Sequence, residues 1–262
     1  MVAKIIFYLH ISNFFPTFVP MKQAMIFAAG LGTRLKPLTD TMPKALVRVG
    51  GKPLLEHVVL RLKDAGYERI VVNVHHFADQ IIDFLKEQNN FGLDIRISDE
   101  REALLETGGG IKKALPLFDP TEPILIHNVD ILSNLDLQSL PTDAPLLVVS
   151  QRQTKRYLLF NDEMRLQGWT NIETGEVKGP IADRQRSKVD GQRLLLAFSG
   201  IHMFHPSLAP LLADWPDRFP ILDFYLKACG DHLIRGYVAH DLRLLDVGKL
   251  DSLEEAEKFL NK

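Results

Sequence analysis

The stretch AAGLGTRLKPLTDTMPK occupies residues 28–44 and follows an apolar run, QAMIFAA (residues 23–29), that is typical of a buried β-strand. Two glycines, Gly30 and Gly32, stand one residue apart just after this strand. Glycine permits unusual backbone dihedrals and close approach, so such a loop can present its N–H groups to phosphates. The pattern indicates a nucleotide-binding loop.

Neither of the two common phosphate loops fits the continuation. A dinucleotide-binding turn requires a third glycine where this chain has the bulky Leu35. A P-loop would supply Gly-Lys-Ser/Thr at once, but here Thr33 and Arg34 follow and the lysine waits until Lys44. Arg34 offers a fixed fork of donors and Lys44 a mobile point charge. Loop amides with two cations favour a nucleoside triphosphate as the ligand.

Strand and helix patterns alternate through the first half of the chain. Strands are predicted at residues 23–29, 69–74, 93–98 and 122–130, and helices at 53–66, 77–88 and at the start of 107–118. Such alternation is typical of right-handed βαβ units. We therefore expect an α/β fold, with a Rossmann-like, mainly parallel sheet flanked by helices.

A change of pattern near residue 151 predicts a β-rich insertion over about residues 151–198. Short strand-like segments at 156–160, 164–170 and 194–198 are separated by turn dipeptides, which favour antiparallel hairpins. A last strand pair (residues 234–240 and 243–247) and a helix (250–260) follow. We interpret residues 21–262 as a single domain.

The first twenty residues carry Lys4 and a short apolar run, like the start of a secretion signal. The run is too short to span a membrane, which takes roughly 20 apolar residues, and Pro16 and Pro20 interrupt it. We interpret Met21 as the functional start and residues 1–20 as a non-essential extension.

Composition narrows the possible partners. The 31 basic and 33 acidic residues nearly balance, which gives no electrostatic case for binding nucleic acid or an anionic membrane. The single cysteine, Cys229, cannot form an intrachain disulfide or a thiolate metal cage, and it is compatible with a reducing cytoplasm.

Two aspartates at the ends of predicted strands suggest a metal site. Asp130 closes the segment HNVD, and Asp246 lies within LLDVG near the C-terminus. Either residue alone would be interpreted as a turn or cap residue. Together with a triphosphate loop they favour Mg²⁺, which binds one or two carboxylates along with phosphate oxygens and water.

These motifs together resemble the sugar-1-phosphate nucleotidyltransferases: AAGLGTRLKPLTDTMPK, HNVD at 127–130 and LDVG at 245–248. The segments LETGGGIKKALPLF (105–118) and FSGIHMFHP (198–206) are similar to the branch that contains N-acetylmuramate-1-phosphate uridylyltransferases of cell-wall recycling and mannose-1-phosphate guanylyltransferase-like proteins. The resemblance implies the nucleotide-diphospho-sugar transferase fold and a cytoplasmic enzyme. It favours UTP and N-acetylmuramate 1-phosphate, with mannose-1-phosphate guanylyl transfer, or another sugar 1-phosphate, as the alternative.

In that reaction a sugar 1-phosphate attacks the α-phosphorus of the triphosphate, and the protein neutralises and aligns two anions. We expect Arg34 and Lys44 to act on the phosphates and Asp130 and Asp246 to hold Mg²⁺. The expected nucleotide-binding residues are Ala28, Ala29, Gly30, Gly32, Thr33, Arg34, Lys44, Gly108 and Gly109. The resemblance places the base at Ala29 and the Gly108–Gly109 loop. The expected substrate-binding residues are Asn73, Asn128, Ser199 and Gly200.

Several questions stay open at this stage. The chain has no Glu-Lys-Pro segment between residues 150 and 180, where many relatives carry a substrate lysine, which leaves Lys178 and Arg165 as candidates. His75 and His76 are interpreted as pocket-wall or capping residues, because adjacent strand positions point oppositely. Two rival functions are a nucleotide-sugar sensor without turnover and a dinucleotide-dependent enzyme.

Overall fold

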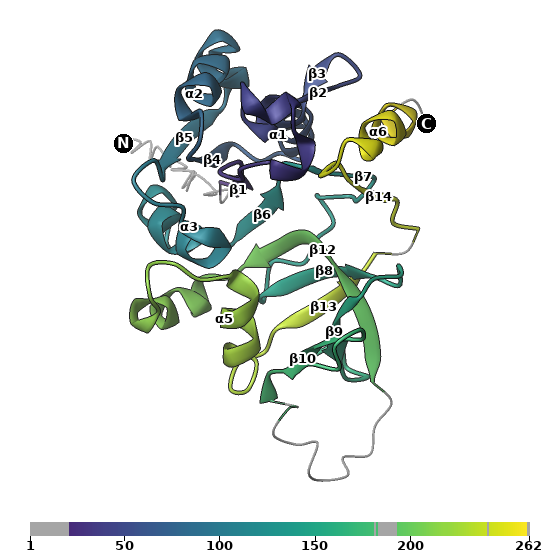
Figure 1. The fold of residues 1–262 in the computed structure, drawn as a ribbon. Helices are drawn as coiled ribbons and strands as arrows, with labels where there is room; N and C mark the ends of the chain where they lie inside the picture. The colour runs from purple at the N-terminus through teal and green to yellow at the C-terminus, as the bar shows by residue number, and fades with distance from the viewer. Residues whose placement is uncertain (1–20, 181, 183–192, 240, 261–262) are drawn as a thin grey trace, which may run out of the picture.

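The computed structural model describes residues 21–180, 182, 193–239 and 241–260. The interpretation of residues 1–20 therefore lies outside the described residues, as does part of the predicted insertion. Within the described residues the chain forms a ten-stranded mixed sheet with helices on both sides, and two small two-stranded sheets (Figure 1).

The parallel part of the sheet has the strand order β6-β1-β4-β5. Its strands are β1 (Gln23–Phe27), β4 (Arg69–Val74), β5 (Asp94–Asp99) and β6 (Ile124–Asn128). The connecting segments contain helices α1 (Leu54–Asp64), α2 (Ala78–Glu87) and α3 (Glu106–Ala114). These are the elements that the alternating pattern predicts, so the expected fold class is confirmed.

The central strands are buried on both faces, and alternate residues enter two different cores. Along β1, Ala24 and Ile26 pack into one core, whereas Met25 packs into the other. Strand residues alternate between the two faces of a sheet, so each face needs its own cover. Helices α1 and α2 contribute to the first core, and α3 and α5 (Ile221–Ala228) contribute to the second.

The ends of α1 follow from its sequence. Pro53 precedes the first helical residue, where its missing N–H is not needed. The helix ends at Asp64, and Gly66 then turns the chain with φ 81°. A left-handed residue at this position is what commonly terminates a helix, and glycine adopts it without steric strain.

The antiparallel part of the sheet is joined to the parallel part through one long strand, β12 (Leu194–Phe204), which pairs with β6, β8 and β9. The neighbouring strands are β8 (Leu146–Ser150), β9 (Arg156–Phe160), β10 (Leu166–Asn171), β11 (Val177–Lys178) and β13 (Arg235–Val238). The predicted strand ending at residue 198 is thus too short, because pairing with β6 carries β12 on to Phe204.

The predicted last strand pair is also corrected. β13 pairs in parallel with β8, whereas β14 (Leu244–Asp246) pairs with β7 (Ile131–Ser133). The two segments do not pair with each other because different strands take up their edges. The C-terminal helix α6 (Asp251–Leu260) follows β14 and lies beside it (Figure 1).

Short elements complete the chain. They are β2 (Arg48–Val49), β3 (Lys52–Pro53) and the 3-10 turns η1 (Thr33–Leu35), η2 (Leu38–Asp40), η3 (Lys44–Leu46), η4 (Asn89–Gly92), η5 (Leu115–Leu117) and η6 (Pro206–Asp214). Among the residues that the structure describes, no helix combines the length and apolar character that crossing a membrane requires.

One edge of the sheet collects the carboxyl ends of β1, β4, β5, β6, β8 and β13. β1, β4 and β6 run in the same direction, and β8 also runs that way because both it and β6 are antiparallel to β12. β13 is parallel to β8. Ligands of open α/β sheets bind outside the carboxyl ends of strands, so this edge is where a site is expected.

Two buried histidines predict how stability depends on pH. Burial lowers the pKa of His202 to about 3, and burial, with a further contribution from Arg61, lowers the pKa of His127 to about 4. Between these values and about 6.5 the unfolded chain binds more protons than the folded protein. The contribution of each neutral histidine to the free energy of unfolding is therefore fully present above about pH 6.5. It falls as the pH drops, by about 2 kcal/mol per histidine between pH 6.5 and 5.

Urea unfolding at pH 7 and pH 5 measures this loss. His202→Gln removes one titrating group while keeping a partner for the hydroxyl of Tyr225, which lies 2.8 Å from Nδ1 of His202. The variant should lose about 2 kcal/mol less than the wild type over this range. The exposed His76→Gln serves as the control. An unchanged loss in His202→Gln would contradict the assignment.

Candidate active site

The loop after β1 is shaped by contacts of Gly32. This residue is left-handed, with φ 63°, and a Cβ there would lie 2.9 Å from Cγ2 of Thr39 and 3.0 Å from Cβ of Lys44. The hydroxyl of Thr39 donates to the Gly32 carbonyl at 2.8 Å. Gly32 thus lets the loop fold back over the segment that carries Lys44. Leu35, which argued against a dinucleotide turn, is fully buried in the first core.

Asn73, at the carboxyl end of β4, ties the start of this loop to the sheet. Its side-chain oxygen accepts from the backbone N–H of Ala28 at 2.7 Å and of Ala29 at 3.2 Å. Its amide nitrogen donates to Oε1 of Glu100 at 2.8 Å. The amides of Ala28 and Ala29 are therefore not free for a phosphate. Asn73 holds the loop with both ends of its side chain, and its expected contact with the substrate stays a prediction.

Glu100 follows β5 and was not predicted from the sequence as a site residue. Its side chain is fully buried, and Oε2 accepts from the backbone N–H of Leu105 at 3.3 Å. Burial raises the pKa of this carboxyl, while the hydrogen bonds from Asn73 and Leu105 oppose the shift. Its position after a parallel strand is the signal that could have identified it.

The four residues expected to be catalytic come together at one point. Lys44 forms an ion pair with Asp130, and both side chains are mostly buried. Asp246 lies close enough to Asp130 to interact with its carboxylate, and the backbone N–H of Val247 donates to the Asp130 carbonyl at 2.8 Å. The guanidinium of Arg34 reaches the same place: a Cβ on Gly248 would lie 2.7 Å from Nη2 of Arg34 and 2.6 Å from Oδ1 of Asp246.

The paired carboxylates fit a divalent cation. Loss of solvent and the nearby Asp130 carboxylate raise the pKa of Asp246, while Lys44 and Arg34 lower it. Two neighbouring carboxylates at a partly open position suit Mg²⁺. This ion commonly binds one or two protein carboxylates and fills its remaining coordination positions with water and phosphate oxygens. Within the described ranges, no group of three or more histidine, cysteine or acidic side chains gathers as a metal cage.

A pocket of about 400 Å³ opens beside this cluster. Its wall consists of Phe27, Ala29, Gly30, Lys44, Asn73, Glu100, Leu104, Glu106, Thr107, Asn128, Val129 and Asp130. The pocket therefore joins the glycine loop to the Lys44–Asp130 pair. Among the sequence-based candidates, it includes Ala29, Gly30, Lys44, Asn73, Asn128 and Asp130. Thr33 and Arg34 are exposed on the loop outside it.

Gly108 and Gly109 pack against the segment before α5, and their expected part in nucleotide binding stays a prediction. The N–H groups of Gly108 and Gly109 both point to the carbonyl of Phe219, at 2.8 and 3.3 Å. A Cβ at Gly108 would lie 2.1 Å from the Phe219 ring, and one at Gly109 would lie 2.0 Å from the Asp217 carbonyl. Neither residue lines the pocket, because close packing of α3 against the segment before α5 uses both. Glu106 and Thr107 line it instead.

Ser199 and Gly200 lie where β12 is irregular in its pairing with β8. Ser199 is buried, and its hydroxyl accepts from the N–H of Ile201 at 3.2 Å, so this side chain is not free to contact a substrate. A Cβ at Gly200 would lie 2.8 Å from Nδ2 of Asn128. Gly200 therefore leaves room for Asn128, which does line the pocket.

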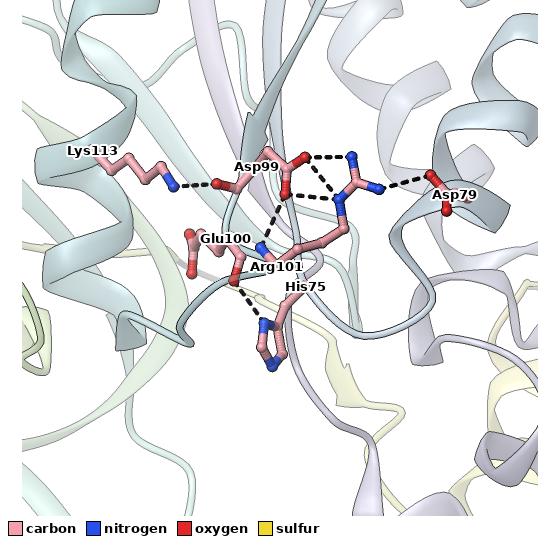
Figure 2. Close-up of polar contacts among 6 residues, drawn as sticks. All are labelled: His75, Asp79, Asp99, Glu100, Arg101 and Lys113. Carbon is pink, nitrogen blue, oxygen red and sulfur yellow. Dashed lines mark hydrogen bonds and ion pairs between the residues drawn. The ribbon is translucent and has the colours of Figure 1, made fainter.

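His75 and His76 do not form a metal pair. Nδ1 of His75 lies 2.7 Å from the Glu100 carbonyl, and Figure 2 shows this ring directed at the backbone of Glu100 beside the Asp79–Arg101–Asp99 ion pairs. His76 is exposed and its ring lies beside the Phe77 ring, with centroids 3.9 Å apart. Neither histidine lines the pocket of the Lys44–Asp130 cluster.

The two basic candidates for the sugar phosphate lie away from this cluster. Lys178 is on β11 and its amino group lies 5.4 Å from the centre of the Trp169 ring. Three strands separate β11 from β6, which corresponds to about 19 Å at ordinary strand spacing. Arg165 pairs through its backbone with Arg235, at the amino end of β13, which is the opposite edge of the sheet. The structure thus corrects both candidates.

Comparisons with known proteins identify the family. Residues 23–145 match the Nucleotidyl transferase family. The chain is 36% identical over 224 residues to an N-acetylmuramate alpha-1-phosphate uridylyltransferase of Caulobacter vibrioides, covering 84% of this chain and 90% of the relative. The chain therefore belongs to the sugar-1-phosphate nucleotidyltransferases, and it is an enzyme of that class.

Two further similarities agree with this conclusion. An N-acetylmuramate alpha-1-phosphate uridylyltransferase of Neisseria meningitidis is 46% identical over 114 residues, which is 44% of this chain and 49% of that protein. A solved UDP-glucose pyrophosphorylase complexed with UDP-glucose has the same fold, with a TM-score of 0.72 and 17% identity over 92% of this chain and 99% of its own. Family membership excludes the alternative of an unrelated dinucleotide-dependent enzyme.

The Asn73 contacts generate a stability prediction. Asn73→Ala leaves two buried backbone N–H groups and the Glu100 carboxylate without their partner, so the free energy of unfolding should fall by about 3 kcal/mol or more. Urea unfolding measures the change. Asn171→Ala removes one exposed turn hydrogen bond, from the N–H of Glu173, and should lower it by about 1 kcal/mol or less. Equal effects of the two variants would show that the loop does not depend on Asn73.

Proposed function

We propose that the enzyme transfers a uridylyl group from UTP to N-acetylmuramate 1-phosphate in the cytoplasm, producing the UDP-sugar and pyrophosphate, as a step of cell-wall recycling. The observation that carries the proposal is the similarity to the Caulobacter vibrioides relative, which bears that name and is matched over nearly its whole length. The cluster of Arg34, Lys44, Asp130 and Asp246 supports the reaction type.

The reaction needs charge neutralisation more than covalent chemistry. A phosphate oxygen of the acceptor forms a bond to the α-phosphorus, the bond from that phosphorus to the β-phosphate oxygen breaks, and pyrophosphate leaves. Both reactants are anions, so bringing them into line requires cations that are already in position. Arg34, exposed on the loop, would receive the β- and γ-phosphates.

We assign Lys44 to the position between the two reactants. Its pairing with Asp130 holds the ammonium group at the pocket wall rather than in solvent. There it can contact both the α-phosphate and the attacking phosphate, so its interaction strengthens as negative charge builds up in the transition state.

Asp130 and Asp246 would hold Mg²⁺. When bound, the ion neutralises phosphate charge and polarises the phosphorus centre. Asp130 follows β6 and Asp246 ends β14, and the hydrogen bond from Val247 to Asp130 keeps their segments together, so the donor set is formed by the fold itself.

A panel of substrates tests the function. Purified protein is mixed with UTP, GTP, CTP or dTTP and with N-acetylmuramate, N-acetylglucosamine, glucose or mannose 1-phosphate, and pyrophosphate release is measured. We expect the highest kcat/KM with UTP and N-acetylmuramate 1-phosphate. A preference for GTP and mannose 1-phosphate would replace this assignment, and no release with any pair would favour a nucleotide-sugar sensor.

The metal assignment predicts the behaviour of Asp246→Asn. The change keeps the shape but removes a charge, so turnover should fall by about 100-fold or more. Binding of Mn²⁺, followed by its electron paramagnetic resonance signal, should weaken as well. Asp251→Asn, on the exposed start of α6, is the control and should change neither. Near-normal turnover of Asp246→Asn at saturating Mg²⁺ would refute the two-aspartate site.

Different phosphates are assigned to Arg34 and Lys44, and the two variants should separate them. Lys44→Ala should lower kcat more than it raises the KM for triphosphate, because the contact is made chiefly in the transition state. Arg34→Lys should impair both triphosphate binding and turnover, since lysine keeps the charge but lacks the bidentate fork of the guanidinium.

Steady-state kinetics with UTP decide between these roles. Lys36→Ala, which breaks only an exposed pair with Asp40, is the matched control and should leave both constants within about two-fold. If Lys44→Ala changed only the KM for triphosphate and left kcat alone, the role assigned to Lys44 would be incorrect.

A further inference from the structure

A pair of strands that stands apart from the main sheet carries the two aspartates of the charged cluster. Asp130 directly precedes β7 and Asp246 ends β14, and these strands pair with each other so that Asp246 lies opposite Ile131. Within the described residues, neither strand pairs with the ten-stranded sheet (Figure 1). The position of Asp246 therefore depends on what fixes this pair of strands against the rest of the molecule.

The backbone contacts between β7 and β14 do not supply that fixed point. The N–H of Val247 donates to the Asp130 carbonyl at 2.8 Å, and the N–H of Asn134 donates to the Arg243 carbonyl at 3.1 Å. Both bonds join the two segments to each other, so they move with the pair. Apolar residues of β7 pack into the first core, but apolar burial is not directional. A directed contact with another element is still needed.

Arg61, on helix α1, makes such a contact. Its Nη1 donates to Oγ of Ser133 at 3.0 Å, and its Nη2 donates to the Leu135 carbonyl at 2.6 Å. Ser133 is buried and lies two residues from Ile131 along β7, about 7 Å away. Hydrogen bonds with one ionised partner are shorter and stronger than neutral ones. The guanidinium thus ties β7 to the helix.

This guanidinium is half-buried and its charge is not paired. Burial lowers the pKa of Arg61, and no carboxylate of the described residues forms an ion pair with it. Arg61 also helps to lower the pKa of the buried His127, so it lies near β6 shortly before Asp130. Removing a cation from water costs free energy. An apolar side chain would avoid that cost, but it could not form a hydrogen bond to β7.

We propose that Arg61 is a positioning residue of the metal site: it holds β7, and through β7 the paired β14, where Asp246 faces Asp130. The inference rests on the proposed function, because it takes these two aspartates as the ligands of Mg²⁺. Arg61 does not line the pocket of the charged cluster, so it acts through the strands. Without it, the two carboxylates are free to move apart. A displacement of about 1 Å in a catalytic arrangement can cost about 100-fold in rate.

Metal affinity tests the tie. Arg61→Met keeps an apolar stem but removes both hydrogen bonds, so Mn²⁺, followed by electron paramagnetic resonance, should bind about 10- to 100-fold more weakly. The kcat with the most active substrate pair should fall by a similar factor. Arg61→Lys keeps the charge without the fork and should give intermediate values. Lys63→Met removes an exposed hydrogen bond from the same helix to the Phe91 carbonyl, and as the control it should change neither quantity.

A milder variant serves if Arg61→Met folds poorly. Ser133→Ala removes only one of the two hydrogen bonds, so it should weaken Mn²⁺ binding less than Arg61→Met does. In the Arg61→Met background the same change should have no further effect, because its partner is already absent. An equal additional loss in the double variant would show that the two side chains act independently, and it would overturn the inference.

Amide hydrogen exchange separates loss of position from loss of global stability, and it needs neither metal nor substrate. In Arg61→Met the N–H groups of Val247 and Asn134 should exchange about 10-fold faster or more, while those of β4 keep their wild-type rates. This result would support the tie even if the substrate panel showed no reaction. Equal acceleration throughout the chain would overturn the inference, because Arg61 would then act on the whole fold.

The two measurements together distinguish failure of the inference from failure of the proposed function. If the wild type bound no Mn²⁺, the proposed metal site would fail, and exchange at Val247 would decide whether Arg61 holds the strands. If the wild type bound Mn²⁺ and Arg61→Met bound it equally well, the positioning role of Arg61 would be refuted while the metal site stood.

Discussion

Two carboxylates held close together are the constraint around which this site is organised. Asp130 follows β6 and Asp246 ends β14, and the Asp130 carboxylate helps to raise the pKa of Asp246. The arrangement persists because Lys44 pairs with Asp130 and Arg34 lies beside Asp246. Each cation comes from the loop after β1, so satisfying the charges also fixes the position of that loop. The backbone hydrogen bond from Val247 to Asp130 adds a contact that does not depend on charge.

The sheet supplies the rigid frame for this cluster. β1, β4 and β6 are buried on both faces, and their residues alternate between two cores. Their carboxyl ends must therefore lie at one edge, where the chain leaves the sheet and polar side chains can gather. Asn73 and Glu100 use that edge differently from Asp130. Both side chains make internal hydrogen bonds, and both form part of the pocket wall.

Sequence patterns predicted the parallel half of the fold well and the site in part. The strands β1, β4, β5 and β6 and the helices between them have strong periodicity, and Arg34, Lys44, Asp130 and Asp246 stand at recognisable positions. The partners of Gly108 and Gly109 could not be predicted, because three glycines indicate close approach without identifying what approaches. Here the neighbour is the segment Asp217–Phe219, more than a hundred residues away in the chain.

The amino-acid sequence by itself determined the local elements and the inventory of charges. Apolar periodicity and turn chemistry act over a few residues, so they specify strands, helices and the glycine loop without reference to the rest of the chain. Only the tertiary structure decided which groups meet. Strand order brought Asp246 beside Asp130 and occupied the hydroxyl of Ser199, while it left Arg165 at the opposite edge. Contacts of this kind depend on pairing and packing between distant segments, which no local pattern encodes.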